Sequence, residues 1–213
     1  MFNEVGILHF LLGFVLGHVC GSVPSGLWLV QAFHGIDIRN YGSKNIGTTN
    51  VFRTVGPKTA VLVLIADAFK GILAVGIMSY LFHNPLLDVI TALGALLGHN
   101  YSLFLGFKGG KGVLVAGGTI LAIQPVLIPF LAVIFLACLL PTGMVSLGSV
   151  TMAALYPVLT ILYGVFRGYS AADLTVCAIG SVIMGAMVIY MHRSNIQRIR
   201  EGKEYRFGRH GKK

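Results

Sequence analysis

The stretch of residues 39–53 combines the side chains that bind phosphate groups in proteins. It reads RNYGSKNIGTTNVFR and carries three cations, Arg39, Lys44 and Arg53, among hydroxyl, amide and glycine residues. Glycine allows backbone N–H groups to face an anion, hydroxyls add donors, and arginine offers two parallel hydrogen bonds to one phosphate. The stretch therefore predicts a phosphate site. Taken alone, it is explained equally well as a solvated loop whose cations only mark the cytoplasmic side of a membrane.

A second stretch, residues 98–112, reads GHNYSLFLGFKGGKG and leads directly into an apolar run. A glycine-rich turn before a helix N-terminus is a favourable place for an anion, which Lys111 could neutralise. It is not a Walker A loop. Leu105 occupies the position of the first glycine of that motif, and Gly112 occupies the position of the Ser or Thr that would bind magnesium. We expect phosphate recognition without ATP chemistry. The alternative is a tight turn whose two lysines only reach out of the membrane.

A third stretch, residues 192–206, follows the last apolar run and reads HRSNIQRIREGKEYR. His192 and Asn195 are three residues apart and share one helix face, so either could orient a substrate hydroxyl. The alternative is a polybasic anchor for anionic lipid headgroups. That alternative fits best the last cations of the chain, Arg209, Lys212 and Lys213.

Two further pairs of polar residues lie within or between apolar runs. Asp67 and Lys70 are three apart inside one run, where an ion pair serves structural support more often than direct chemistry. His83 and Asp88 have the His-x-x-x-x-Asp spacing that is known from one class of acyltransferases. Because they fall in a short outer loop away from every basic cluster, we expect no catalytic role for them.

The sequence offers no nucleophile for a covalent intermediate and no cluster of metal ligands. It has no Ser/His/Asp arrangement, and its cysteines lie far apart inside apolar runs, where they are expected to serve packing. These cysteines are Cys20, Cys138 and Cys177. We therefore expect no metal site.

The composition predicts a membrane protein. Of the 213 residues, 55% are hydrophobic and 11% are charged, whereas a soluble domain has about 25% charged residues. We expect a single membrane-embedded domain over residues 1–213. The N-terminus has no basic region before its apolar run, so this run is expected to be a retained span and not a cleaved signal peptide.

The placement of cations decides the number of spans. The apolar runs are Val5–Phe33, Thr59–Phe82, Leu86–Leu97, Val113–Leu139, Val145–Val165 and Ala171–Met191. Of sixteen Lys and Arg residues, four lie between residues 34 and 58, two lie in the second stretch and eight follow Met191. Cytoplasmic loops carry the Lys and Arg excess. All three clusters fall on one side only if Val113–Leu139 breaks near Gln124–Pro125, where proline disfavours a helix.

This break predicts an all-α integral membrane fold with seven transmembrane helices, some of them short. The N-terminus lies outside, the C-terminus lies inside, and residues 192–213 form a basic cytoplasmic tail. Without the break there would be six spans, and the tail would lie outside.

The three stretches together resemble the motifs of a known enzyme family. The segments GSKNIGTTNVFRTVG, GHNYSLFLGFKGGKG and HRSNIQRIREGKEYRF are similar, in order and spacing, to the three motifs of the bacterial acyl-phosphate:glycerol-3-phosphate acyltransferases, the PlsY family. The segment DAFKG at Asp67–Gly71 is also similar. The resemblance runs from near Gly21 to about Phe207 and thus covers nearly the whole chain.

The resemblance implies a small helical enzyme of the bacterial inner membrane, with its active site facing the cytoplasm. The implied reaction moves a fatty acyl group from acyl-phosphate to the 1-hydroxyl of glycerol-3-phosphate. It yields lysophosphatidic acid and phosphate, in the first step of phospholipid synthesis. The implied partners are these substrates and membrane lipids, without cofactor or nucleic acid, and the chain is expected to act as a monomer.

The resemblance also assigns roles to single residues. Those expected to act directly on the substrates are Ser43, Arg53, Lys111, His192 and Asn195. Those expected to shape the loops or cradle phosphate are Gly42, Asn45, Asn50, Gly109, Gly110 and Gly112. Structural support is expected from Asp67, Lys70 and Glu204. Lys44 stands where the family pattern has glycine, and Thr48 where it has alanine, which leaves the geometry of the first turn open.

The missing nucleophile agrees with direct transfer, because acyl-phosphate is a mixed anhydride whose phosphate leaves readily. His192 could take the proton of the attacking hydroxyl. Alternatively, a substrate phosphate oxygen takes it while His192 and Asn195 position glycerol-3-phosphate, which the resemblance favours. The three stretches are expected to meet in one pocket at the cytoplasmic rim. A transporter for an organic phosphate and a lipid-binding scaffold are the alternative functions.

Overall fold

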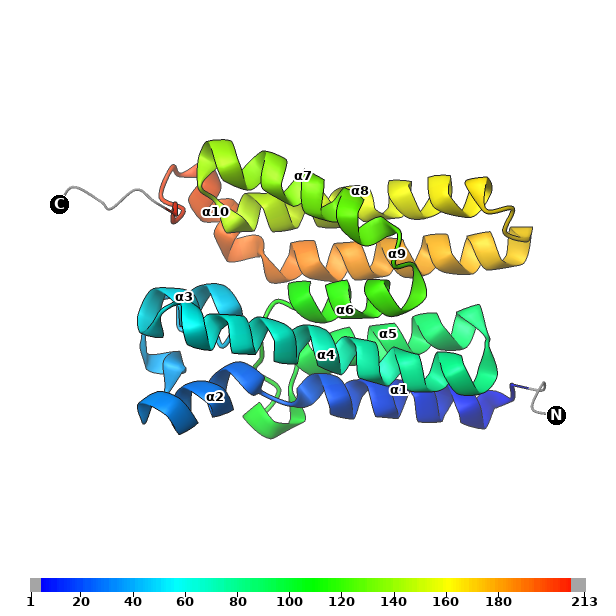
Figure 1. The fold of residues 1–213 in the computed structure, drawn as a ribbon, viewed down its shortest axis with the longest axis horizontal. Helices are drawn as coiled ribbons and strands as arrows, with labels where there is room; N and C mark the ends of the chain where they lie inside the picture. The colour runs from blue at the N-terminus through cyan, green and yellow to red at the C-terminus, as the bar shows by residue number, and fades with distance from the viewer. Residues whose placement is uncertain (1–4, 208–213) are drawn as a thin grey trace. The chain divides into compact units, whose positions relative to one another are not determined.

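In the computed structural model, which describes residues 5–207, the chain is helical (Figure 1). The described residues form ten α-helices and two short 3-10 helices. The α-helices are α1 (Ile7–Ser22), α2 (Ser25–His34), α3 (Thr48–Val55), α4 (Pro57–Phe82), α5 (Pro85–Asn100), α6 (Val113–Ile123), α7 (Leu127–Thr142), α8 (Val145–Phe166), α9 (Ala171–Met191) and α10 (Arg193–Arg200). The 3-10 helices are η1 (Ile38–Asn40) and η2 (Leu103–Leu105).

The chain packs into two compact units, each of which is described by itself. Unit 1 is Met1–Pro125 and unit 2 is Val126–Lys213. The first four residues, Met1–Glu4, and the last cations, Arg209, Lys212 and Lys213, lie outside the described residues. The single domain expected from the sequence stays a prediction.

In unit 1, α1 packs along α5, and α4 packs against α1, α5 and α6 (Figure 1). Small residues let these helices approach closely. A side chain on Gly17 or Gly21 of α1 would strike the backbone of α5. The segment from η1 to α3 and the loop before α6 lie at one end of this group, opposite the α4–α5 turn (Figure 1).

In unit 2, α7, α8 and α9 are consecutive neighbours, and α10 packs against α8 and α9 (Figure 1). The segment after α10 returns to the α7–α8 turn, where the Phe207 N–H donates to Gly143 O at 2.7 Å. Arg167 follows α8 and lies at the other end of this unit.

The predicted break in the long apolar run is confirmed. Helix α6 ends at Ile123 and α7 begins at Leu127, so Gln124 and Pro125 stand between them. The short apolar run Leu86–Leu97 lies within helix α5, which extends to Asn100.

A second break was not predicted, because the run Val5–Phe33 was expected to form one span. Helix α1 ends at Ser22 and α2 begins at Ser25. Pro24 lacks a backbone donor and disfavours helical backbone in the residue before it, and this explains the interruption.

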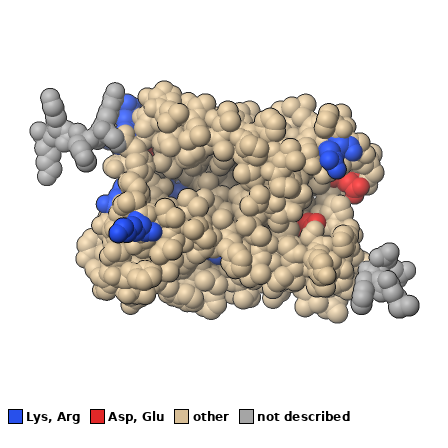
Figure 2. Space-filling model, viewed as in Figure 1, with Lys and Arg blue, Asp and Glu red and all other residues tan. Residues whose placement is uncertain are grey.

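Within residues 5–207, four helical segments are long and apolar enough to cross a membrane: Ile7–His34, Pro57–Phe82, Val145–Phe166 and Ala171–Met191. Large apolar side chains lie exposed along the helices, for example Ile7, Leu140 and Phe166. Most of the face in Figure 2 carries neither acidic nor basic side chains, as is typical of a surface that contacts lipid. The count of seven spans and the orientation of the termini stay predictions.

Candidate active site

The loop between η1 and α3 is organised by one buried amide, that of Asn50. Its Nδ2 donates to Asn45 O at 2.8 Å, to Tyr41 O at 3.0 Å and to Ile38 O at 3.4 Å. Its Oδ1 accepts the backbone N–H of Ser43 at 2.8 Å. A single side chain therefore satisfies backbone groups along the whole loop, which leaves the Ser43 side chain at the surface.

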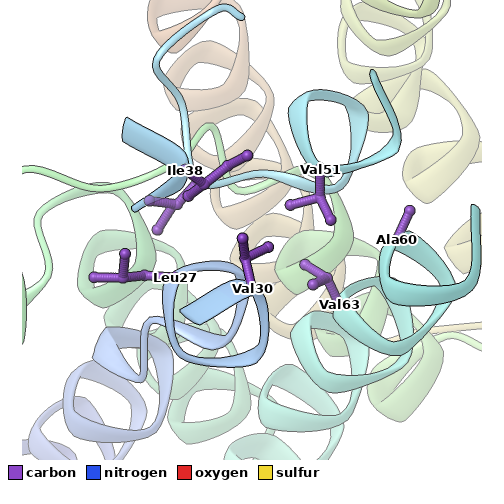
Figure 3. Packing of buried hydrophobic residues seen from close by; sticks show 7 residues of the cluster. Leu27, Val30, Ile38, Val51, Ala60 and Val63 are labelled. Carbon is purple, nitrogen blue, oxygen red and sulfur yellow. The ribbon is translucent and has the colours of Figure 1, made fainter. Parts of the chain in front are cut away.

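A hydrophobic cluster supports this loop from below (Figure 3). Its members come from α2, η1, the loop itself, α3 and α4. They are Leu27, Val30, Ile38, Ile46, Val51, Ala60 and Val63. Val51 and Arg53 both belong to α3. Burial of Val51 therefore fixes the helix that carries the arginine.

The first turn holds Lys44 in an unusual backbone conformation. Its φ is +58°, in the left-handed region that favours glycine. Its N–H donates to Tyr41 O at 2.9 Å and closes the turn. Gly42, with φ +55°, lies so close to Asn50 that a side chain there would strike the amide. The structure thus keeps the turn with lysine at the position where the family pattern has glycine.

Two cations of this segment have different surroundings. Arg39 is exposed and pairs with Asp37 at 2.6 Å. The pKa of the Asp37 carboxyl is lowered, mainly by the hydrogen bond from the Arg39 side chain and secondarily by the one from the Arg39 backbone N–H. Arg53 is half-buried on α3. At the start of α3, the Thr48 hydroxyl oxygen is buried without a hydrogen-bond partner.

The second segment is built onto the end of α5. The Gly110 N–H donates to His99 O at 3.0 Å. A side chain on Gly109 would strike the His99 carbonyl, and one on Gly110 would strike the His99 ring. Gly112 has φ +78° and precedes α6, so the half-buried Lys111 lies between glycines at a helix N-terminus. Leu105 of η2 packs against the cluster that supports the first segment.

The ion pair expected from the spacing of Asp67 and Lys70 is present on α4. Lys70 Nζ lies 2.9 Å from Asp67 Oδ1, and both side chains are buried. Lys70 also donates to Val23 O at 2.8 Å, and the Ser25 hydroxyl donates to Asp67 Oδ1 at 2.5 Å. The pair therefore holds the unpredicted break between α1 and α2.

The third segment lies in unit 2, where α9 passes into α10. His192 follows α9 and is buried, and its Nδ1 lies 2.7 Å from Val188 O. Because a carbonyl can only accept, Nδ1 carries a proton, and the neutral ring has its lone pair on Nε2. Asn195 is buried on α10, and its Nδ2 donates to Glu204 Oε1 at 2.6 Å.

Glu204 connects three parts of unit 2. Besides Asn195, it accepts from the Ser146 hydroxyl of α8 at 2.7 Å and from Arg198 Nε of α10 at 2.8 Å. Burial by itself would raise the pKa of the Glu204 carboxyl, but the hydrogen bonds from Asn195, Ser146 and Arg198 outweigh it and lower the pKa. The carboxylate is therefore ionised at neutral pH and orders the segment after α10.

The units divide the expected site residues into two sets. Ser43, Arg53 and Lys111 belong to unit 1, at the end where its two glycine-rich segments lie. His192 and Asn195 belong to unit 2. Their convergence on one pocket stays a prediction, as do the roles assigned to each residue.

The His83 and Asp88 pair lies elsewhere. It stands at the α4–α5 turn of unit 1, at the end opposite both glycine-rich segments (Figure 1). Asp88 Oδ2 accepts from the Ser79 hydroxyl at 3.2 Å.

Sequence reasoning missed several partners that hold the site residues. Ser25 and His99 lie beside Asp67, and Ser146 contacts Glu204. Ser25 directly follows a proline within an apolar run. This was the one sequence signal that the helix is interrupted there and that a polar side chain serves the interruption.

Comparisons with known proteins agree with the motifs. A family model described as glycerol-3-phosphate acyltransferase matches residues 11–202. The glycerol-3-phosphate acyltransferases of Fusobacterium nucleatum and Syntrophomonas wolfei are each 42% identical to this chain. The first match covers 91% of this chain and 95% of the relative, and the second covers 89% and 93%.

Solved structures agree as well. A crystal structure of PlsY, an integral membrane glycerol 3-phosphate acyltransferase, in its glycerol 3-phosphate form matches with a TM-score of 0.81 and 35% identity. The match covers 93% of this chain and 96% of that one. The lysophosphatidic acid form of PlsY matches with the same TM-score and 34% identity, over 93% of this chain and 95% of that one. The chain therefore belongs to the glycerol-3-phosphate acyltransferase family, as an integral membrane protein of the PlsY type.

Proposed function

We propose that this acyltransferase moves a fatty acyl group from acyl-phosphate to the 1-hydroxyl of glycerol-3-phosphate. The observation that carries the proposal is the placement of two basic, glycine-rich segments on one support. Leu105 of the second segment packs against the cluster that holds the first. Both substrates carry a phosphate, and each segment has the backbone and side-chain donors that phosphate needs.

The chemistry asks mainly for placement and for neutralisation of charge. Two phosphates repel each other, and Arg53, Lys111 and the loop N–H groups offset that repulsion. Alignment of a hydroxyl with the acyl carbonyl lowers the barrier by roughly 7–11 kcal/mol relative to free reactants. The hydroxyl oxygen bonds to the carbonyl carbon, the bond from that carbon to the phosphate oxygen breaks, and phosphate leaves. No covalent enzyme intermediate is needed.

The proton of the attacking hydroxyl passes to a substrate phosphate oxygen. In this proposal His192 and Asn195 position glycerol-3-phosphate and take no proton. The His192 tautomer supports a positioning role, because an Nε2 lone pair can accept a hydrogen bond from a substrate hydroxyl. The same tautomer is the one a general base would need, so a substitution must separate the two roles.

The reaction would take place at the cytoplasmic face of the bacterial inner membrane, as the first step of phospholipid synthesis. Membrane lipids surround the apolar helices, and the acyl chain lies between helices with its head at the surface. Support comes from the basic segments, because cytoplasmic loops carry the Lys and Arg excess. The enzyme is proposed to act as a monomer.

The identity of the donor is the part of the proposal that an assay can test directly. Purified protein in detergent is given radiolabelled glycerol-3-phosphate with acyl-phosphate, acyl-CoA or acyl carrier protein that carries the same chain. Of the three donors, only acyl-phosphate should yield lysophosphatidic acid. Lysophosphatidic acid formed from acyl-CoA or acyl carrier protein, with none formed from acyl-phosphate, would overturn the proposed donor.

A further inference from the structure

The ion pair of α4 is fixed to the break between α1 and α2 by two contacts. Lys70 Nζ donates to Val23 O, and the Ser25 hydroxyl donates to Asp67. A charge pair sealed from water in this way keeps its geometry only if its partners hold it. The break is thus a fixed point within unit 1.

From this point one contact leads to the first phosphate segment. Gly26 follows Ser25 and lies against the backbone of Ile46, so closely that a side chain would strike the Ile46 carbonyl. Ile46 belongs to the buried cluster beneath the loop. The place of the loop that carries Ser43 therefore depends on the break.

A second contact leads from the ion pair to the other segment through His99. Its Nδ1 lies 4.0 Å from Asp67 Oδ1, and its ring lies against Gly110, which directly precedes Lys111. Its carbonyl accepts the Gly110 N–H. His99 is 4% exposed, and its ring lies between Asp67 and Gly110. What it can do is hold Gly110, and with it Lys111.

We propose that His99, held beside the Asp67–Lys70 pair, is a positioning residue that sets the place of Lys111 for acyl transfer. The inference rests on the proposed function. The imidazole fills the space between the Asp67 carboxylate and Gly110. The ring therefore sets the distance between α4 and the loop that carries Gly110 and Lys111. The same geometry requires glycine at position 110, because any side chain would push against the ring.

A double-mutant cycle between His99 and Gly110 tests this proposal. The variants are His99→Ala, Gly110→Ala and the double variant, with kcat/KM for glycerol-3-phosphate as the readout. Each single variant should lower kcat/KM at least tenfold. Because both act on one contact, the double variant should lie within threefold of the more damaged single variant. The matched control is Gly117→Ala on α6, where a side chain meets nothing within 4 Å, and it should stay within twofold of wild type.

A second His99 variant covers the case in which alanine prevents folding. His99→Asn keeps a polar group in the buried position and should also lose at least tenfold while it elutes as a single peak in detergent. Wild-type kcat/KM in both His99 variants would overturn the proposal. So would a double-variant loss equal to the product of the single losses, or failure of both His99 variants to fold.

Failure of the inference differs from failure of the proposed function. If the wild type forms lysophosphatidic acid from acyl-phosphate and the His99 variants do so equally well, only the positioning role is wrong. If the wild type forms none, the proposed function is wrong, and the positioning role falls with it.

Discussion

Asn50 Oδ1 accepts the backbone N–H of Ser43 at 2.8 Å, so the amide of one residue places the hydroxyl of another seven positions earlier. The Asn50→Ala substitution removes this bond and the hydrogen bonds that the Asn50 amide donates to three backbone carbonyls. We expect kcat/KM to fall at least tenfold, and the free energy of unfolding to fall by about 1–3 kcal/mol. Asn40→Ala, at an exposed position of η1, is the control and should change neither. Wild-type kinetics in Asn50→Ala would contradict the account of the loop.

Substitution of His192 tests whether the protein or a substrate takes the proton of the attacking hydroxyl. The His192→Gln substitution keeps a side chain that accepts a hydrogen bond but removes the imidazole that a general base would need. Under the proposed mechanism, in which a substrate phosphate oxygen takes the proton, turnover at saturating substrates should stay within about threefold of wild type. A loss of more than a hundredfold, in a protein that still binds glycerol-3-phosphate, would show that His192 is the general base.

Glu204 predicts a pH dependence of stability in unit 2. The folded carboxyl has a pKa below its ordinary value of 4.5, so the unfolded chain binds the proton more readily. The stabilisation is present above that ordinary value and is lost as the pH falls through the lowered folded pKa. Thermal unfolding in detergent should therefore show a steeper loss of Tm on acidification in wild type than in Glu204→Gln. Identical curves would contradict this role of the carboxylate.

Lys44 predicts a stability difference that comes from the backbone alone. Its left-handed conformation costs a non-glycine residue about 1–2 kcal/mol, which glycine avoids. Lys44→Gly and Lys44→Ala both remove the charge, but only the first relieves the conformation. Lys44→Gly should therefore be the more stable variant, by about 1 kcal/mol in the free energy of unfolding after the greater freedom of glycine in the unfolded chain is counted. A more stable Lys44→Ala would contradict the observed turn.

The sequence predicted well those features that depend on local patterns. The helix break at Gln124–Pro125 followed from a proline and from the distribution of cations. The pairing of Asp67 with Lys70 followed from their spacing on one helix face. The geometry of the turn at Lys44 was left open because the family pattern has glycine there. The positive φ explains why glycine suits that position.

What could not be predicted depends on contacts between distant parts of the chain. Ser25 reaches Asp67 across 42 residues, and Ser146 reaches Glu204 across 58. No periodicity marks such partners, because they are set by how helices pack and not by a local repeat. The break at Pro24 was missed because apolar residues continue on both sides of it, and hydropathy does not record a missing hydrogen bond.

We propose that cations of the two glycine-rich segments bind the phosphate groups of both substrates during direct acyl transfer. The release of inorganic phosphate from acyl-phosphate by purified protein, measured with and without glycerol-3-phosphate, tests this binding. Wild type should release one phosphate for each lysophosphatidic acid formed, and only with glycerol-3-phosphate present. Arg53→Ala and Lys111→Ala should lose nearly all of this release while they remain folded. Arg39→Ala and Lys108→Ala, at exposed positions of the same segments, should keep it.

Phosphate release that needs no glycerol-3-phosphate, or wild-type release in folded Arg53→Ala or Lys111→Ala protein, would show that these segments do not hold the reacting phosphates.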